Sequence, residues 1–333
     1  MINSFSFCLN RSRLARTKPT FLALLVLTTS LALSVSAHAK FGRADFSDAG
    51  DFSEAAILSG VVATSAQCQT AANIVWVETK NAGSECLKYL KGGFDALPVK
   101  RAVVFFHGDV FVGAGKTSKN YLGLNNATLQ KNASAWAKRL GLPYVFFCRP
   151  GNYGWYSNHM QRRRIGESEL ISAALDGFKK RYGVKEWVLA SQSGGGHVTS
   201  SLITQRADIV CAVSASAPSS TCVRSEMMGR NRDTTGYADS YDPSKFVVKD
   251  NTHPELRVFV LGDPSDRNVF WASQTVMAEA LKIMQIPVHL QQGTGEGPDA
   301  HGLSNSARHI ASWCAKNTAT DEILIQAAKG LKG

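Results

Sequence analysis

Short apolar runs alternate with longer amphipathic segments along most of this sequence, and this alternation is the feature that most limits the fold. Clear examples of the apolar runs are RAVVFFHGD (101–109), PYVFFCRPG (143–151) and EWVLAS (186–191). Each has the length of a strand and is apolar on both faces, as the strands of a buried parallel sheet are. The pattern predicts an α/β fold, with a mostly parallel central sheet and helices on both of its faces.

The segments between the apolar runs carry helical signals. ATLQKNASAWAKRLG (127–141) and ESELISAALDGFKKRYG (167–183) each end at a glycine, a common helix terminator. Strands are also expected at NIVWVETK (73–80), ECLKYL (85–90), DIVCAVSAS (208–216), LRVFVLGD (256–263) and PVHLQQG (287–293), and helices at HVTSSLITQR (197–206), VFWASQTVMAEALKIMQ (269–285) and SNSARHIASWCAKNT (304–318).

Composition fits one large domain. The chain has 333 residues, of which 44% are hydrophobic, and no internal repeat or low-complexity linker interrupts it. We therefore expect a single α/β domain over 40–333. Its longest irregular connection, 214–255, is long enough to have a function of its own, such as a small cap.

The first 39 residues have the pattern of a secretory signal peptide. Four basic residues precede the apolar run FLALLVLTTSLALSVS (21–36), which is followed by Ala37-His38-Ala39. Cleavage is predicted after Ala39, which would leave a secreted or periplasmic protein without membrane contact. The apolar run is short for a membrane-spanning helix, although an uncleaved N-terminal anchor stays open.

Charge argues against a nucleic acid partner. Removal of the signal lowers the formal net charge from +11 to +7, and the remaining Lys and Arg residues are scattered. The densest basic run, Arg162-Arg163-Arg164, has only Trp155 and Tyr156 as nearby aromatic residues, so a solvated loop face is the better interpretation.

Six cysteines remain after Cys8 leaves with the signal, and an even number in an exported protein favours disulfides. Sequence cannot choose among the pairings. The short separations favour Cys68 with Cys86 and Cys211 with Cys222, which leaves Cys148 to pair with Cys314 or to remain a free buried thiol. No His/Cys spacing suggests zinc, so no metal site is expected.

LASQSGGGHV (189–198) places three glycines where a strand should lead into a helix. Since glycine inside a structured element costs about 0.5–1 kcal/mol relative to alanine, three in a row indicate a close backbone approach. A nucleophile elbow requires small residues two positions before and after its serine, and Ser191 and Gly195 flank Ser193 in this way. The usual G-x-S-x-G pattern has glycine where this chain has Ser191, and a plain Gly/Ser turn is the alternative.

Few polar residues follow the predicted strands, and three of them suggest acyl-transfer chemistry. Ligands of open α/β sheets bind beyond the carboxyl ends of the strands. Ser193, Asp266 and His301 each follow a different strand there, in the chain order Ser, Asp, His. They are the candidate nucleophile, acid and base.

From about residue 100 to 315 the sequence resembles the α/β-hydrolase superfamily. VVFFHGD looks like the family's oxyanion loop and SQSGGG looks like its elbow. GDPSDRNV looks like its acid loop and DAHGL looks like its histidine loop. The segment RPGNYGWYSNHMQRRRIGE is similar to a loop of prolyl-oligopeptidase-like members. The resemblance implies the α/β-hydrolase fold and a Ser193–His301–Asp266 triad. It assigns the oxyanion hole to the backbone N–H groups of Gly194 and Asp109.

Other polar and aromatic residues near the motifs have weaker assignments. Tyr153, Trp155 and Tyr156 either line an acyl pocket or cover a loop surface. His107 is expected to be a structural hydrogen-bonding residue. Asp263, which lies between Gly262 and Pro264, is expected to bond its own backbone and to play a local role.

These patterns predict an exported serine hydrolase that cleaves an ester or amide of a small-molecule or peptide substrate through an acyl-enzyme, without a cofactor. The first alternative is a serine peptidase of the prolyl-oligopeptidase type, although this chain lacks a propeller domain. The second is a non-catalytic binding module on the same fold. The sequence does not identify the substrate.

Overall fold

The structure is a computed structural model that describes residues 63–70, 72–112, 116–153 and 158–331, together with Phe52, Glu54 and Ile57. The predicted export signal lies outside the described residues, as do Trp155 and Tyr156.

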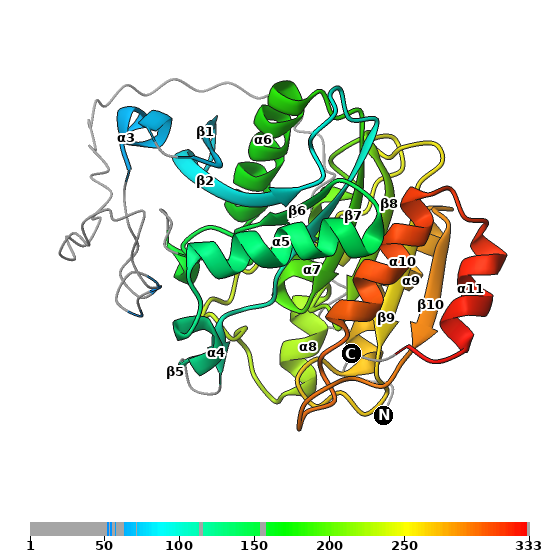
Figure 1. Cartoon of the computed structure of the whole chain (residues 1–333). Coiled ribbons are helices and arrows are strands. Elements are labelled where there is room, and N and C mark those ends of the chain that lie inside the picture. The colour runs from blue at the N-terminus through cyan, green and yellow to red at the C-terminus, as the bar shows by residue number, and fades with distance from the viewer. Residues whose placement is uncertain are drawn as a thin grey trace, which may run out of the picture. The chain divides into compact units, whose positions relative to one another are not determined.

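An eight-stranded sheet forms the centre of the fold (Figure 1). In sheet order its strands are β1 (Ile74–Thr79), β2 (Gly83–Gly92), β6 (Tyr144–Phe147), β3 (Arg101–Phe106), β7 (Glu186–Gln192), β8 (Ile209–Ala215), β9 (Arg257–Gly262) and β10 (Val288–Gln292). β2 pairs antiparallel with both of its neighbours, and the other adjacent pairs are parallel. The predicted mostly parallel sheet is confirmed.

Burial explains why the central strands are apolar throughout. All seven residues of β8 are buried, as are five of the seven in β7. β10 lies at one edge of the sheet and has no fully buried residue, which fits its more polar sequence VHLQQ. Strands covered on both faces cannot alternate between polar and apolar residues, and this is the signal that the sequence carries.

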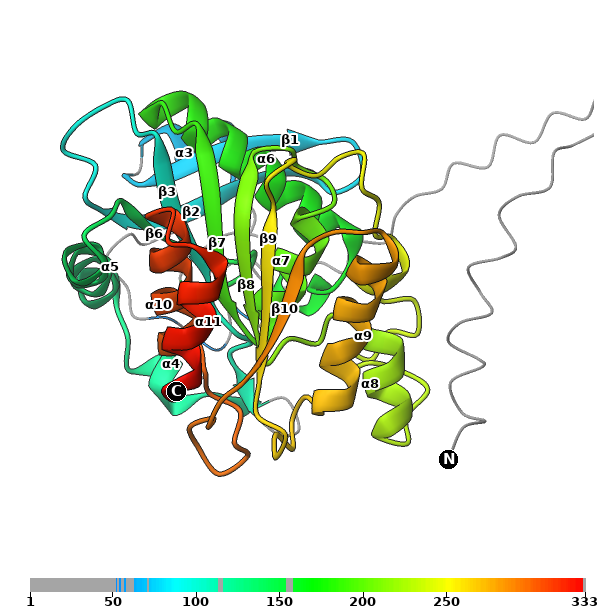
Figure 2. The same cartoon turned by 90° about the vertical axis from the view of Figure 1, so that its right-hand side faces the viewer.

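Helices cover both faces of the sheet, as predicted (Figure 2). One face is covered by α5 (Asn126–Leu140), α10 (Ser304–Ala315) and α11 (Thr320–Ala328), and the other by α6 (Ile165–Tyr182), α7 (Gly194–Leu202) and α9 (Trp271–Ile283). α5 and α6 end at Gly141 and Gly183, whose positive φ angles of 64° and 65° close each helix. α11 has no counterpart among the predicted elements.

Shorter elements gather at the carboxyl end of the sheet, the lower end in both views. α4 (Lys119–Leu122) and the β4–β5 pair (Phe111–Val112 with Lys116–Thr117) follow β3, and α8 (Thr221–Met227) and the short helix η3 (Pro243–Lys245) lie in the long connection between β8 and β9. Two further short helices are α3 (Ser65–Thr70) and η2 (His159–Gln161).

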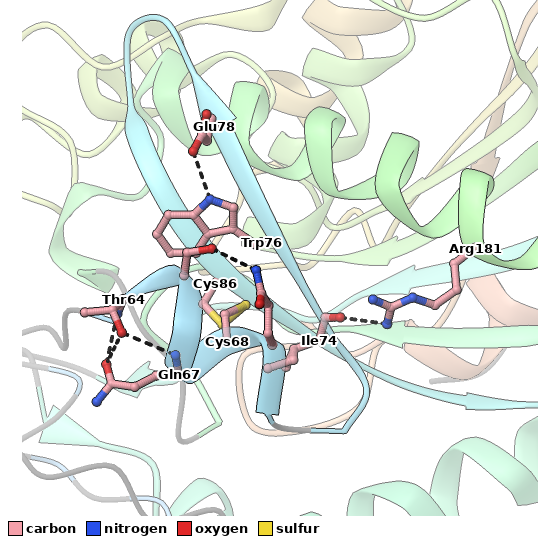
Figure 3. Close-up of a disulfide and its surroundings, with 10 residues drawn as sticks. Thr64, Gln67, Cys68, Ile74, Trp76, Glu78, Cys86 and Arg181 are labelled. Atoms are coloured by element: carbon pink, nitrogen blue, oxygen red, sulfur yellow. Dashed lines mark hydrogen bonds between the residues drawn. A yellow bond between two sulfur atoms is a disulfide. The ribbon is translucent and has the colours of Figure 1, made fainter.

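The first of the two disulfides in the described residues joins α3 to β2. Cys68 pairs with Cys86, as predicted, and Trp76 lies beside the bond with its indole N–H donated to Glu78 (Figure 3). On the same hairpin the carbonyl oxygen of Ile74 accepts a hydrogen bond from Arg181 of α6. The disulfide thus ties the edge hairpin β1–β2 to α3, and the Arg181 bond ties the hairpin to α6.

The second disulfide corrects the predicted pairing. Cys211 pairs with Cys314 across 103 residues, so the Cys211–Cys222 and Cys148–Cys314 pairings are wrong. Cys211 lies early in β8, whereas Cys222 lies in α8 beyond the opposite end of that strand. α10 runs back along the sheet and brings Cys314 to Cys211. Cys148 is a buried free thiol, and burial raises its pKa to about 12.

Of the helices in the described part of the chain, none combines the length and the apolar character needed to cross a membrane.

Candidate active site

Ser193 occupies a strained turn between β7 and α7. Its backbone angles are φ 53° and ψ −123°, which an L-residue rarely adopts. The N–H of Ser193 donates to the carbonyl oxygen of Ala215 (2.8 Å), and its own carbonyl oxygen accepts from the N–H of Gly196 (2.7 Å). The turn is thus fixed from both sides, with its serine side chain only partly buried, as in a strand-to-helix nucleophile elbow.

The three glycines after Ser193 are explained by close packing. A Cβ atom on Gly194 would collide with the Asp109 carboxylate, one on Gly195 with the carbonyl oxygen of Phe106, and one on Gly196 with the side chain of Ala217. The first turn of α7 therefore lies directly against the loops that follow β3 and β8. A larger residue at any of the three positions would push the elbow away from these loops.

Asp266 and His301, predicted from different loops, lie in contact. Oδ2 of Asp266 accepts from Nδ1 of His301 at 2.8 Å, and its Oδ1 accepts from the backbone N–H groups of Asn268 (2.8 Å) and Val269 (2.9 Å). The Asp266 side chain is fully buried and that of His301 is 18% exposed. Nε2 of His301 is buried without a hydrogen-bond partner among the described residues. The imidazole is therefore held by a hydrogen bond at Nδ1, whereas its Nε2 makes no hydrogen bond to the described residues.

Gln192 connects the elbow to the histidine loop, a role that sequence reasoning missed. Its Nε2 donates to the carbonyl oxygen of His301 and its Oε1 accepts from the N–H of Leu303, both at 2.8 Å. Because Gln192 directly precedes Ser193, its amide group brings the backbone of the histidine loop to the elbow. A hydrogen bond between Ser193 Oγ and His301 Nε2 is absent from the described contacts; such bonds are often long before substrate binds.

The two proposed oxyanion donors lie on segments that touch. A Cβ atom on Gly108 would lie 3.2 Å from Cβ of Ser193, so the loop after β3 passes beside the serine. Gly194 is the first residue of α7, where helices leave N–H groups without internal partners. Neither the Gly194 N–H nor the Asp109 N–H has a hydrogen-bond partner among the described residues.

The carboxylate of Asp109 is surrounded by arginines. Oδ1 accepts from Nη1 of Arg149 (2.8 Å), and Oδ2 accepts from Nε of Arg162 (3.1 Å) and from Nη2 of Arg163. Arg149 is fully buried and also pairs with Glu167 at 2.8 Å. Burial alone would raise the pKa of Asp109, but Arg163, Arg149 and Arg162 together hold it well below its ordinary value.

The solvated loop face predicted for the three arginines is therefore mostly wrong. The side chains of Arg162 and Arg163 are only 5% and 4% exposed, whereas that of Arg164 is 29% exposed and pairs with Asp239. Arg163 has a positive φ of 62°, so the chain turns at this residue. The prediction failed because a run of arginines is expected to be solvated unless the carboxylates that neutralise it can be identified.

Two buried histidines flank this cluster in neutral form. Nε2 of His107 accepts the N–H of Arg149, and burial, with Arg149 adding to it, lowers the His107 pKa to about 3. Nδ1 of His159 contacts the Asn152 side chain (2.9 Å), and burial, with Arg149 next in effect, places its pKa well below the ordinary value. The structural hydrogen-bonding role predicted for His107 fits these contacts.

Tyr153 and Asp263 have more contacts than the sequence indicates. Tyr153 is 7% exposed, and its ring packs against Phe52, Tyr121, His107 and Phe146. Asp263 bonds its own turn through the N–H of Ser265 (2.7 Å), as predicted, but its other oxygen accepts the N–H of Gly295 (2.8 Å) on the histidine loop. Its role is not purely local.

The described residues contain no group of three or more His, Cys, Asp and Glu side chains arranged to hold a metal ion.

Comparison with known proteins gives matches in structure only. No family model and no curated protein matches the sequence. An acylaminoacyl peptidase in complex with Z-Gly-Gly-Phe-chloromethyl ketone matches 76% of this chain at 15% identity, with a TM-score of 0.50. Prolyl oligopeptidase B from Galerina marginata matches 74% at 12% identity (TM-score 0.52), and an esterase from Pyrococcus furiosus matches 81% at 13% identity (TM-score 0.51).

The matches differ in how much of the other chain they cover. This chain covers 41% and 36% of the lengths of the two peptidases, but 97% of the esterase.

Proposed function

From the premise that this chain has the α/β-hydrolase fold, we propose that it is a serine hydrolase that cleaves small carboxylic esters through an acyl-enzyme. Ser193 is the nucleophile, His301 the general base and Asp266 the residue that orients His301. The observation that carries the proposal is the buried Asp266–His301 hydrogen bond with the other imidazole nitrogen unpartnered, on a loop that Gln192 ties to the elbow.

The first half of the reaction is acylation. Nε2 of His301 takes the proton from Ser193 Oγ as the oxygen attacks the ester carbonyl carbon. The carbonyl oxygen becomes negative and accepts hydrogen bonds from the N–H groups of Gly194 and Asp109. The intermediate collapses as the C–O bond to the alcohol breaks, and the leaving alkoxide receives the proton that His301 holds.

The second half releases the acid. His301 takes a proton from water, the resulting hydroxide attacks the acyl carbon, and the bond to Ser193 Oγ breaks as the oxygen recovers its proton from His301. In both halves the buried Asp266 carboxylate stabilises the imidazolium and keeps a proton on Nδ1. The two backbone N–H groups that bond Oδ1 of Asp266 hold the carboxylate in place for this task.

Ester cleavage is preferred over the two alternatives on specific grounds. The esterase from Pyrococcus furiosus is matched over nearly its whole length, whereas the peptidases extend well beyond the matched region. A serine peptidase remains the second candidate, because those peptidases share the fold. A non-catalytic binding module would have no use for a buried carboxylate aligned on an imidazole beside a strained serine.

Export is part of the proposal. Two disulfides in the described residues are typical of proteins in oxidising compartments. Together with the N-terminal pattern that ends at Ala39, they support a secreted or periplasmic protein whose domain spans 40–333, in which 214–255 forms part of a small cap over the site.

A substrate panel tests the proposed function. Purified protein is assayed on p-nitrophenyl esters of increasing acyl length beside aminoacyl and dipeptidyl anilides, with Ser193→Ala as the blank. We expect Ser193-dependent hydrolysis of the esters and little or no hydrolysis of the anilides. Faster cleavage of anilides than of esters would establish the peptidase alternative, and no Ser193-dependent turnover of either class would leave only the binding module.

A further inference from the structure

Arg224 in α8 is a buried cation without an acidic partner. Its side chain is almost fully enclosed, yet within the described part of the chain its guanidinium bonds only to Asn268, through Nε to the backbone carbonyl oxygen (3.0 Å) and through Nη2 to Oδ1 (2.8 Å). Among the described residues no carboxylate lies at ion-pair distance from it. Buried charges are ordinarily paired, because burial of an unpaired ion is costly.

Other buried arginines show what compensation usually looks like in this protein. Arg149, Arg162 and Arg163 share the Asp109 carboxylate, and Arg206 pairs with Asp176 and Asp208. Arg308 pairs with no carboxylate of the described residues, but its guanidinium lies over the rings of Phe105 and Trp136. Arg224 has neither kind of partner in the described part of the chain.

The unused donors of Arg224 suit a planar anion. A guanidinium carries five N–H groups, and Asn268 accepts from two of them. The remaining N–H groups include both of those on Nη1. Burial, with Arg163 adding to it, lowers the Arg224 pKa to about 10, so the group stays charged at neutral pH. A guanidinium fork of this kind binds a carboxylate in bidentate fashion.

Arg224 lies at the proposed catalytic site. Asn268, which it bonds, donates its own N–H to the Asp266 carboxylate. α8 follows β8, whose last residue, Ala215, accepts the N–H of Ser193. The guanidinium therefore lies beside the acid loop, on the connection that leaves the carboxyl end of β8, the strand whose last residue bonds Ser193.

We propose that Arg224 recognises a carboxylate on the substrate, so that the enzyme prefers esters that carry a free carboxylate to neutral esters of the same size. The inference rests on the proposed ester hydrolysis and names its substrate class. The bonds to Asn268 hold the guanidinium in position, and the free N–H groups bind the anion.

The test compares matched esters in wild-type protein and in Arg224→Gln. The carboxylate is placed on the acyl side in mono-p-nitrophenyl succinate and glutarate, with the butyrate and valerate esters as neutral partners. It is placed on the leaving-group side in 4-acetoxybenzoate, with phenyl acetate as partner. Arg230→Gln is the matched control, because Arg230 follows α8 in the same connection and is exposed.

We expect the wild type to favour the charged member of at least one pair. Arg224→Gln should lower kcat/KM for that member by about 10- to 100-fold, as for loss of a charge-assisted hydrogen bond, and by less than threefold for the neutral member. Arg230→Gln should change neither. An equal loss on both members would show that Arg224 only positions the acid loop, and the absence of a wild-type preference in all three pairs would also overturn the inference.

A binding measurement keeps this inference separate from the proposed function. Glutarate and 4-hydroxybenzoate are titrated calorimetrically into Ser193→Ala protein, which cannot turn over. If glutarate or 4-hydroxybenzoate binds, and the binding is lost when Arg224→Gln is added, the anion site is supported even if no ester is cleaved. If neither anion binds, the anion site is refuted even if esters are cleaved. Should Arg224→Gln fail to fold, Arg224→Lys serves instead, since it keeps the charge and loses the bidentate fork.

Discussion

Two largely enclosed aspartates lie at the carboxyl end of the sheet and have opposite kinds of partners. Asp109 follows β3 and meets three guanidinium groups, whereas Asp266 follows β9 and meets two backbone N–H groups and one imidazole. The Asp109 side chain is 13% exposed and that of Asp266 is fully buried, so both are largely enclosed and differ mainly in their partners. A carboxylate saturated with cations fixes a loop, whereas one that faces a single titratable ring can support proton transfer.

The difference also separates what the two sides of Ser193 contribute. In the proposed mechanism the Asp109 side supplies a backbone N–H, and the Asp109 carboxylate and Arg149 lie directly against Gly194 of α7. The Asp266 side supplies an imidazole whose outer nitrogen has no partner among the described residues. Changes on the first side should therefore act mainly on stability, and changes on the second mainly on rate.

The largest effect should come from Asp266→Asn. Loss of the negative charge favours the wrong imidazole tautomer, and kcat should fall by about 10⁴-fold with the protein still folded. Ester hydrolysis and thermal unfolding measure the two quantities. Asp263→Asn is the control, and it should cost about 1–3 kcal/mol of stability through the Gly295 contact and lose less than tenfold in rate. The reverse ranking in rate would move the acid to Asp263.

Asp109→Asn should act on stability first. Removal of one charge from a buried ion-pair cluster leaves guanidinium groups uncompensated, at a cost of about 3–5 kcal/mol. Urea unfolding at pH 7.5 measures this loss, and Asp239→Asn, which removes the exposed partner of Arg164, should change it by less than 1 kcal/mol. A variant of unchanged stability that had lost all activity would give the Asp109 carboxylate a catalytic role and remove the contrast.

Mild acid should destabilise the Asp109 side. Burial lowers the pKa of both His107 and His159, so only the unfolded state takes up protons below about pH 6.5. The contribution of the two neutral histidines to the free energy of unfolding is fully present above that pH. It should fall by about 1.4 kcal/mol per pH unit for each histidine as the pH decreases. Below about pH 4 the stabilisation from ionised Asp109 declines as well. Urea midpoints at pH 7.5, 6.0 and 5.0 check this, and equal midpoints would contradict it.

A smaller effect is expected at Gln192, which joins the two sides. Gln192→Ala removes both bonds to the histidine loop, so His301 should be held less well in position. We expect kcat to fall by about tenfold, which corresponds to a loss of about 1–1.5 kcal/mol. KM should change little, and the pH profile of kcat should shift because the imidazole environment changes. Gln192→Glu keeps the acceptor for Leu303 and should lose less. An unchanged kcat in Gln192→Ala would limit this residue to packing.

Local signals in the sequence account for most of the fold. β3, β6 and β7 are predictable because strands buried on both faces must be apolar throughout, and α5 and α6 because Gly141 and Gly183 end them. The elbow is predictable because close packing against neighbouring loops leaves no room for a Cβ atom, so three consecutive glycines are required there.

Features that depend on distant partners were not predictable. Arg162 and Arg163 are buried because Asp109, some fifty residues earlier, neutralises them, and nothing near them in the chain indicates it. Cys211 reaches Cys314 because α10 folds back along the sheet, a path that spacing does not contain. Likewise, Gln192 is identified as a bridge only when the histidine loop is seen beside it.

The central claim, that Ser193 is an activated nucleophile, is tested most directly by reaction with a fluorophosphonate followed by mass spectrometric mapping of the adduct. Ser191 is fully buried and its hydroxyl donates to the carbonyl oxygen of Val213, so it offers an internal comparison two residues away. We predict one adduct, on Ser193, that forms in native but not in denatured protein and is lost in His301→Ala. An adduct on Ser191, or none on the folded protein, would contradict the account.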